Sequence, residues 1–80
     1  MRDRSSIEVG LVNMLSEVMG TTPDELRETP VLAAHPWDSL TNLEALVQVE
    51  TLWKVSLDLR AYLGARTVDE LVELIVSARG

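Results

Sequence analysis

The sequence predicts an all-α protein, a small four-helix bundle of three main helices and one short helix, with a long loop between the first and second helices. Three stretches repeat apolar residues at helical spacing, and capping residues or glycines stand at their ends. The chain has 80 residues, of which 46% are hydrophobic. This length suits one small bundle, so we expect a single domain over residues 1–80.

The first helix is predicted over Ser6–Met19, with Ser6 as its N-cap and Gly20 as its C-terminal stop. Its apolar residues keep to one face, and they are Ile7, Leu11, Met14, Leu15 and Val18. The long loop then covers Gly20–Asp38. It contains the prolines Pro23, Pro30 and Pro36, which disfavour helix at the preceding residue. Within it, Thr22–Glu25 has the form of a capping box, so we expect one short helical turn there.

Two further helices are predicted near the C-terminus. A short helix is expected over Asp58–Leu63, with Asp58 as its cap and Gly64 as its end. A second capping box, Thr67–Glu70, opens the last helix. The apolar residues of that helix are Val68, Leu71, Val72, Leu74, Ile75 and Ala78. Val55–Leu57 is prone to β structure but has no obvious partner strand.

The second long helix, predicted over Ser39–Trp53 and capped by its first residue, has two apolar faces. At about 100° per residue, one face, expected to be the core stripe, holds Ala45, Leu46, Val49, Leu52 and Trp53. The other, roughly 140° away, holds Leu40, Leu43 and Val47. Glu44 and Glu50 border this second face. Two interpretations are open: it packs beneath the loop, against Leu32 or Trp37, or it forms a partner surface with an acidic rim.

The composition excludes several classes of function. The chain has no Cys and one His, so disulfides, thiolate metal sites, cysteine nucleophiles and multi-histidine metal sites are not expected. A net charge of −6 and only two Trp and one Tyr disfavour nucleic-acid binding. No apolar run approaches the roughly 20 residues that span a bilayer. Because Met1–Ser6 lacks the features of a signal peptide, we expect a cytoplasmic protein without membrane partners.

Ser39 lies where the proline-bearing loop meets a helix. Serine is among the commonest N-caps, so the residue alone indicates only a cap. Nucleophilic catalysis is not indicated, because the one histidine, His35, lies four residues upstream and no third group or oxyanion-hole motif is identifiable. We therefore expect no catalytic residue and no enzyme. If Ser39 has a chemical role, it is to accept a modification, near the positive end of a helix dipole that tolerates phosphate.

A longer pattern surrounds Ser39. An Asp-Ser-Leu tripeptide opens the stretch Trp37–Glu50 along a helix, and Trp53, Val55–Leu57, Arg66–Val68 and Glu70–Leu71 follow it. This pattern resembles the acyl carrier protein family, which includes the peptidyl carrier domains. The resemblance extends from Ile7 to about Ser77. The tripeptide alone is a weak signal, but its combination with the helix, the loop and the Thr-Val pair is fairly specific.

The resemblance implies that Ser39 carries 4′-phosphopantetheine through a phosphodiester, attached from coenzyme A by a phosphopantetheinyl transferase. It also implies that the carboxylates Asp38, Glu44 and Glu50 meet basic patches on partner enzymes. The apolar contacts would come from Leu40, Leu43 and Val47. The expected partners are an acyltransferase, a ketosynthase or acyl- or aminoacyl-loading enzymes, and the protein is expected to be a monomer that performs no catalysis itself.

The sequence also departs from the family pattern. His35 and Pro36 stand where the family often has Leu-Gly, which predicts a stiffer turn before Ser39. The absence of a Gly-Gly pair favours an acyl over a peptidyl carrier. A tryptophan beside the serine, here Trp37, is a feature that resembles discrete carriers of polyketide or hybrid polyketide–nonribosomal peptide pathways. We expect the Trp37 side chain either to pack at the edge of the core or to contact a partner. A peptidyl or aminoacyl carrier and an unmodified helical adaptor are the alternative functions.

Overall fold

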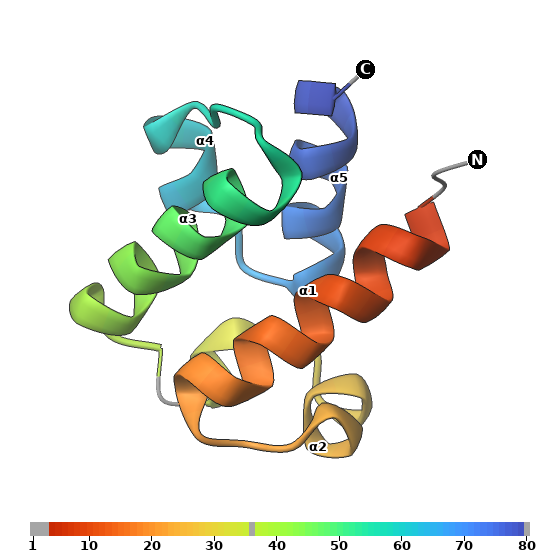
Figure 1. Ribbon diagram of the computed structural model, residues 1–80. Helices are drawn as coiled ribbons and strands as arrows, with labels where there is room; N and C mark the ends of the chain where they lie inside the picture. Colours follow the sequence, from red (N-terminus) through yellow and green to blue (C-terminus); the bar gives the residue numbers. More distant parts are fainter. Residues whose placement is uncertain (1–3, 36, 80) are drawn as a thin grey trace.

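The computed structural model describes residues 4–35 and 37–79, and its regular structure is helical (Figure 1). The elements in order are α1 (Arg4–Met19), α2 (Pro23–Glu28), a 3₁₀ turn η1 (Leu32–Ala34), α3 (Ser39–Trp53), α4 (Leu59–Gly64) and α5 (Val68–Arg79). The predicted all-α bundle is therefore confirmed, and the single turn expected within the loop is a six-residue helix. Val55–Leu57 forms no strand. Pro36, expected to stiffen the turn before Ser39, and residues 1–3 lie outside the described ranges.

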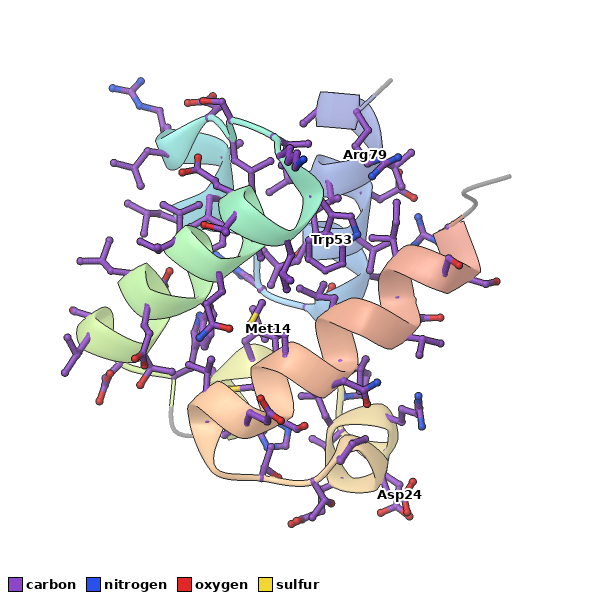
Figure 2. All side chains as sticks on the ribbon, in the orientation of Figure 1. Met14, Asp24, Trp53 and Arg79 are labelled. Carbon is purple, nitrogen blue, oxygen red and sulfur yellow. The ribbon has the colours of Figure 1, made fainter. Side chains whose placement is uncertain are left out.

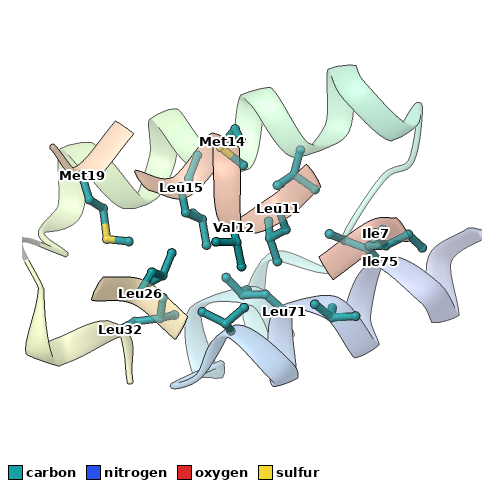
Figure 3. Close-up of a cluster of buried hydrophobic side chains, with 14 of the residues drawn as sticks. Ile7, Leu11, Val12, Met14, Leu15, Met19, Leu26, Leu32, Leu71 and Ile75 are labelled. Carbon is teal, nitrogen blue, oxygen red and sulfur yellow. The ribbon is translucent and has the colours of Figure 1, made fainter. Parts of the chain in front are cut away.

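Helix α1 crosses the middle of the bundle and contacts α5, α3 and α2. Figure 3 shows its buried side chains between α3 on one side and α5 on the other. The most deeply buried aliphatic side chains come from five elements, α1, α2, η1, α3 and α5, and they include Leu11, Leu15, Leu26, Leu32, Val49, Leu71 and Ile75. The apolar stripes predicted for the first and last helices thus form one common core, except that Ala78, in the last turn of α5, is exposed.

The start of α1 lies earlier than the sequence predicts. The helix begins at Arg4, so the prediction that Ser6 is its N-cap is wrong. The guanidinium of Arg4 pairs with Asp69 and Glu73 on α5, which holds the first turn of α1 against a helix far away in the sequence. At the other end, Gly20 adopts a left-handed conformation (φ 72°) and stops the helix as predicted.

The loop between α1 and α3 is anchored at both ends. The Thr22 Oγ1 accepts a hydrogen bond from the Glu25 N–H (3.2 Å), so the predicted capping box opens α2. Further on, the Leu32 N–H donates to the Arg66 carbonyl (2.9 Å) and the Val68 N–H to the Pro30 carbonyl (3.0 Å). These bonds attach the loop to the segment before α5 and fix the approach to α3.

One side of α3 faces the core, as predicted, with one exception. Ala45 and Val49 are buried, and Leu46 packs partly against the core. At the end of α3, the indole of Trp53 turns inward toward α1 (Figure 2), where a Cβ added at Gly10 would lie 3.1 Å from the ring. Because Trp53 fills the interior there, Leu52, at the edge of the stripe, is 59% exposed, and its assignment to the core is wrong.

The C-terminal elements begin at the predicted caps. The Asp58 carboxylate accepts from the Arg60 N–H (3.2 Å) at the start of α4, which ends at Gly64. The Thr67 and Glu70 side chains each accept a hydrogen bond from the other residue's N–H, at 3.2 and 3.1 Å, so the second capping box is confirmed. No helix within the described ranges is long and apolar enough to cross a membrane.

Candidate functional site

The candidate site begins at the first turn of α3. Asp38, in extended conformation, is the N-cap, and its Oδ1 accepts a hydrogen bond from the Thr41 N–H at 2.8 Å. This bond from the Thr41 backbone lowers the pKa of the Asp38 carboxyl from its usual value of 3.8. Ser39 is therefore the first helical residue, and the prediction that it is the N-cap is wrong. Asp and Ser are both good N-caps, but the N-cap position requires an extended backbone, which Asp38 has and the helical Ser39 does not.

This assignment leaves the Ser39 hydroxyl free. The residue is exposed, and its Oγ makes no hydrogen bond to any described residue. A serine that caps a helix uses its oxygen to accept a backbone N–H, whereas here the Asp38 carboxylate does so. The result is a primary alcohol on a rigid helix start, open to a partner and beside the positive end of the helix dipole.

The second apolar face of α3 is exposed to solvent. Leu40 is 78% exposed, Leu43 51% and Val47 63%, so these side chains do not pack beneath the loop. Leu32 is instead buried in the core and Trp37 packs partly against it. Of the two interpretations left open by the sequence, packing under the loop is wrong. What remains is an unpartnered apolar strip that begins next to Ser39.

Helix α4 adds two exposed leucines that were not recognised from the sequence. Leu59 and Leu63 are each about half exposed and stand four residues apart, so they share one side of α4. In Figure 2, side chains of α3 and α4 project away from the other helices on the same side of the molecule. The spacing of these two leucines in a helix of six residues was the available signal, since a helix this short cannot bury every side.

The charged residues around the strip differ in their roles. Asp38 and Glu44 are exposed carboxylates. Glu50 is partly buried, and its Oε2 accepts the Leu57 N–H at 3.0 Å, so this side chain also holds the segment between α3 and α4. Arg60 is exposed next to Leu59 on α4. The charged side chains of α3 beside the strip are therefore acidic.

A groove of about 400 Å³ lies on the loop side of this surface. It is lined by Val31, Leu32, Ala33, Trp37, Asn42, Leu63, Ala65 and Arg66. Trp37 thus packs at the core edge and lines the groove, which accords with one of its two expected positions. The Oδ1 of Asn42 is buried and has no hydrogen-bond partner among residues 4–35 and 37–79.

Among the described residues, no histidine or carboxylate is hydrogen-bonded to the Ser39 hydroxyl as a general base would be. His35 is partly buried, and its Nε2 donates to the Thr29 carbonyl at 2.6 Å. No group of three or more His, Cys, Asp or Glu side chains in the described part of the chain could hold a metal ion.

Comparison with known proteins identifies no relative: no protein-family model, curated protein or solved structure matches this chain.

Proposed function

We propose that this protein is a discrete acyl carrier protein. It holds an acyl intermediate, or an aminoacyl or peptidyl one, as a thioester on 4′-phosphopantetheine attached to Ser39. It presents this group to partner enzymes, in polyketide or related secondary-metabolite biosynthesis. The observation that carries the proposal is the exposed Ser39 hydroxyl, which is free because Asp38 caps α3.

The chemistry divides between this chain and its transferase. The Ser39 oxygen bonds to the phosphorus of coenzyme A that bears the pantetheine, the pyrophosphate P–O bond breaks, and adenosine 3′,5′-bisphosphate leaves. The serine proton goes to a base of the transferase, since His35 is hydrogen-bonded within the loop. The attached group supplies a thiol, which a chain without cysteine lacks. The open helix start gives the serine the exposure that a large modifying enzyme requires.

The apolar strip of Leu40, Leu43 and Val47 supports a role for this surface in partner binding. Apolar side chains at the centre of an interface supply most of the affinity, whereas charges at its rim mainly guide encounter. Asp38 and Glu44 would meet basic groups on the transferase and on acyl-transferring or condensing enzymes. Glu50 would contribute less than expected, since its carboxylate is already bonded to the Leu57 N–H.

The test is incubation with coenzyme A and a promiscuous phosphopantetheinyl transferase, followed by intact mass measurement. We expect a mass gain of one phosphopantetheinyl group, its loss in Ser39→Ala, and its persistence in Ser56→Ala, the change of another exposed serine. A protein that gains no mass, or gains it in Ser39→Ala, is not a carrier of this kind.

The exposed strip also favours a second candidate, an unmodified helical adaptor that binds its partner through Leu40, Leu43 and Val47. The two candidates differ at Ser39. A partner captured equally well by the native protein and by Ser39→Ala, with no modification at any serine, would support the adaptor.

A further inference from the structure

A second pocket lies between α1, α2 and the start of α5, away from the surface that holds Ser39. Its volume is about 300 Å³, at the lower end of the range of small-molecule pockets. None of the described residues that line it belongs to α3 or α4, and Figure 1 shows α2 at the opposite end of the molecule from α4. The lining residues are Glu8, Val12, Leu26, Arg27, Pro30, Val68 and Asp69.

The floor of this pocket is apolar and preformed. Val12, Leu26 and Val68 are 2%, 0% and 3% exposed, so each is fixed by the core behind it. The Val68 N–H donates to the Pro30 carbonyl at 3.0 Å, which ties the wall at Pro30 to the first residue of α5. A ligand that enters the pocket therefore does not have to order its floor.

The rim of the pocket carries charges of both signs that do not pair with each other. Arg27 makes no ion pair with any described residue, although Glu8 and Asp69 line the same pocket. Asp69 pairs with Arg4 at 3.5 Å, whereas Glu8 has no ion pair among residues 4–35 and 37–79. The pocket thus offers one free guanidinium and one free carboxylate above an apolar floor.

This combination selects a ligand that carries both charges. A simple cation would be repelled by Arg27, and a simple anion by Glu8 and Asp69. A zwitterion is attracted by both signs, and an aliphatic group on it would cover the apolar floor. An apolar α-amino acid has an ammonium, a carboxylate and an aliphatic side chain on one carbon atom, and its size suits a pocket this small.

We propose that this pocket binds a free apolar α-amino acid such as leucine. The carboxylate of the ligand pairs with Arg27, and its ammonium pairs with Glu8, because Asp69 is already bonded to Arg4. The aliphatic side chain lies on the floor. The inference goes beyond the proposed carrier function and does not rest on it, since this ligand is neither attached to Ser39 nor in contact with α3.

The experiment is an NMR titration of the unmodified, ¹⁵N-labelled protein with L-leucine. We expect saturable shifts of the backbone amides of Glu8, Arg27 and Val68, and none at Leu40 or Val47. A native protein without saturable shifts at the pocket overturns the proposal.

Analogues of leucine test whether both charges are recognised. L-Leucinamide lacks the carboxylate and N-acetyl-L-leucine lacks the ammonium, and they stand for the first and last residues of a peptide. Each should bind about fivefold more weakly than leucine, the loss of one hydrogen bond of ordinary net strength. Glycine, which has no side chain for the floor, should also bind more weakly. If either analogue binds as tightly as leucine, the pocket does not recognise a free amino acid and the proposal is wrong.

Two variants with matched controls test the two charged groups. Arg27→Gln and Glu8→Gln should each weaken leucine binding about fivefold. Both side chains are exposed, so neither change should unfold the protein. Arg60→Gln on α4 and Glu17→Gln on α1 change the net charge by the same amounts at exposed positions and should preserve binding. Unchanged affinity in the pocket variants, or an equal loss in their controls, contradicts the assignment.

Discussion

At the scale of single residues, the site depends on two neighbours with different tasks. Asp38 satisfies the free N–H of Thr41, and Ser39 keeps its hydroxyl exposed. Under the proposed function, the capping carboxylate would contribute without touching the group attached to Ser39. It caps the first turn of α3, so that in the proposed function a transferase would meet a serine at a well-defined helix start.

The Asp38 cap should make stability depend on acidity. Its pKa is lowered in the folded protein, so the contribution of the charged cap is complete above the unfolded value of 3.8 and is lost as the pH falls through the lower folded value. We expect native protein to be more stable than Asp38→Asn at pH 6 and the difference to vanish in acid, because Asn caps without titrating. Urea unfolding at several pH values measures this; a difference that is the same at all pH values contradicts it.

Tyr62 provides a second prediction at this scale. Its buried hydroxyl is hydrogen-bonded to the Asn42 carbonyl, and burial raises the pKa of Tyr62 far above its usual value of 10.0. Tyr62→Phe should lower the free energy of unfolding by about 1 kcal/mol at neutral pH. Because only the unfolded chain ionises this tyrosine just above pH 10, native protein should lose stability there relative to Tyr62→Phe. Denaturant unfolding at pH 7 and pH 11 tests both signs.

At the scale of elements, α3 serves two surfaces at once. Its Val47 is 63% exposed, whereas Val49, two residues on, is 1% exposed. Val49→Ala should cost about 2 kcal/mol of unfolding free energy, from lost burial and the cavity left behind. Val47→Ala should change it by less than about 0.5 kcal/mol and should instead slow modification by the transferase. Equal losses of unfolding free energy in the two variants would show that Val47 is packed in the core and would contradict an exposed strip.

The ends of the elements show what could be predicted from sequence. The caps of α2, α4 and α5 depend on residues within four positions, and their residue types reveal them. The start of α1 was missed because Arg4 is held by Asp69 and Glu73, a contact between distant parts of the chain. Leu52 was misplaced because Trp53 fills the interior next to it. Periodicity identifies a stripe, but not which of its edge residues the neighbouring helices cover.

Some parts of the candidate site could also be predicted from sequence, and others could not. The tripeptide Asp38–Leu40 and the strip could be found from spacing, and the structure leaves Leu43 and Val47 exposed. The groove was not predictable, because its lining comes from the loop, α3, α4 and the segment before α5. Nor was the bond from the Leu57 N–H to Glu50, since a glutamate on a helix shows no sign in the sequence of which backbone group it meets.

At the scale of the whole molecule, the net charge of −6 is expected to act through its distribution. Glu44 borders the strip on α3, whereas Glu28 ends α2. Reversal of either residue to lysine changes the net charge equally, so the two variants differ only in where the charge changes. Glu44→Lys should lower kcat/KM for modification by a basic transferase by roughly tenfold at low salt, and Glu28→Lys should have little effect. The difference should shrink as ionic strength rises. Equal effects of the two reversals would show that only net charge matters.

The central claim, that Ser39 accepts the phosphopantetheinyl group, is tested most directly by mapping the modification. The protein is treated with coenzyme A and the transferase and digested, and the peptide around Trp37–Asn42 is sequenced by tandem mass spectrometry. The carrier function predicts a phosphodiester on Ser39 and on no other hydroxyl. A modification on Thr41, or none on this peptide, would contradict it.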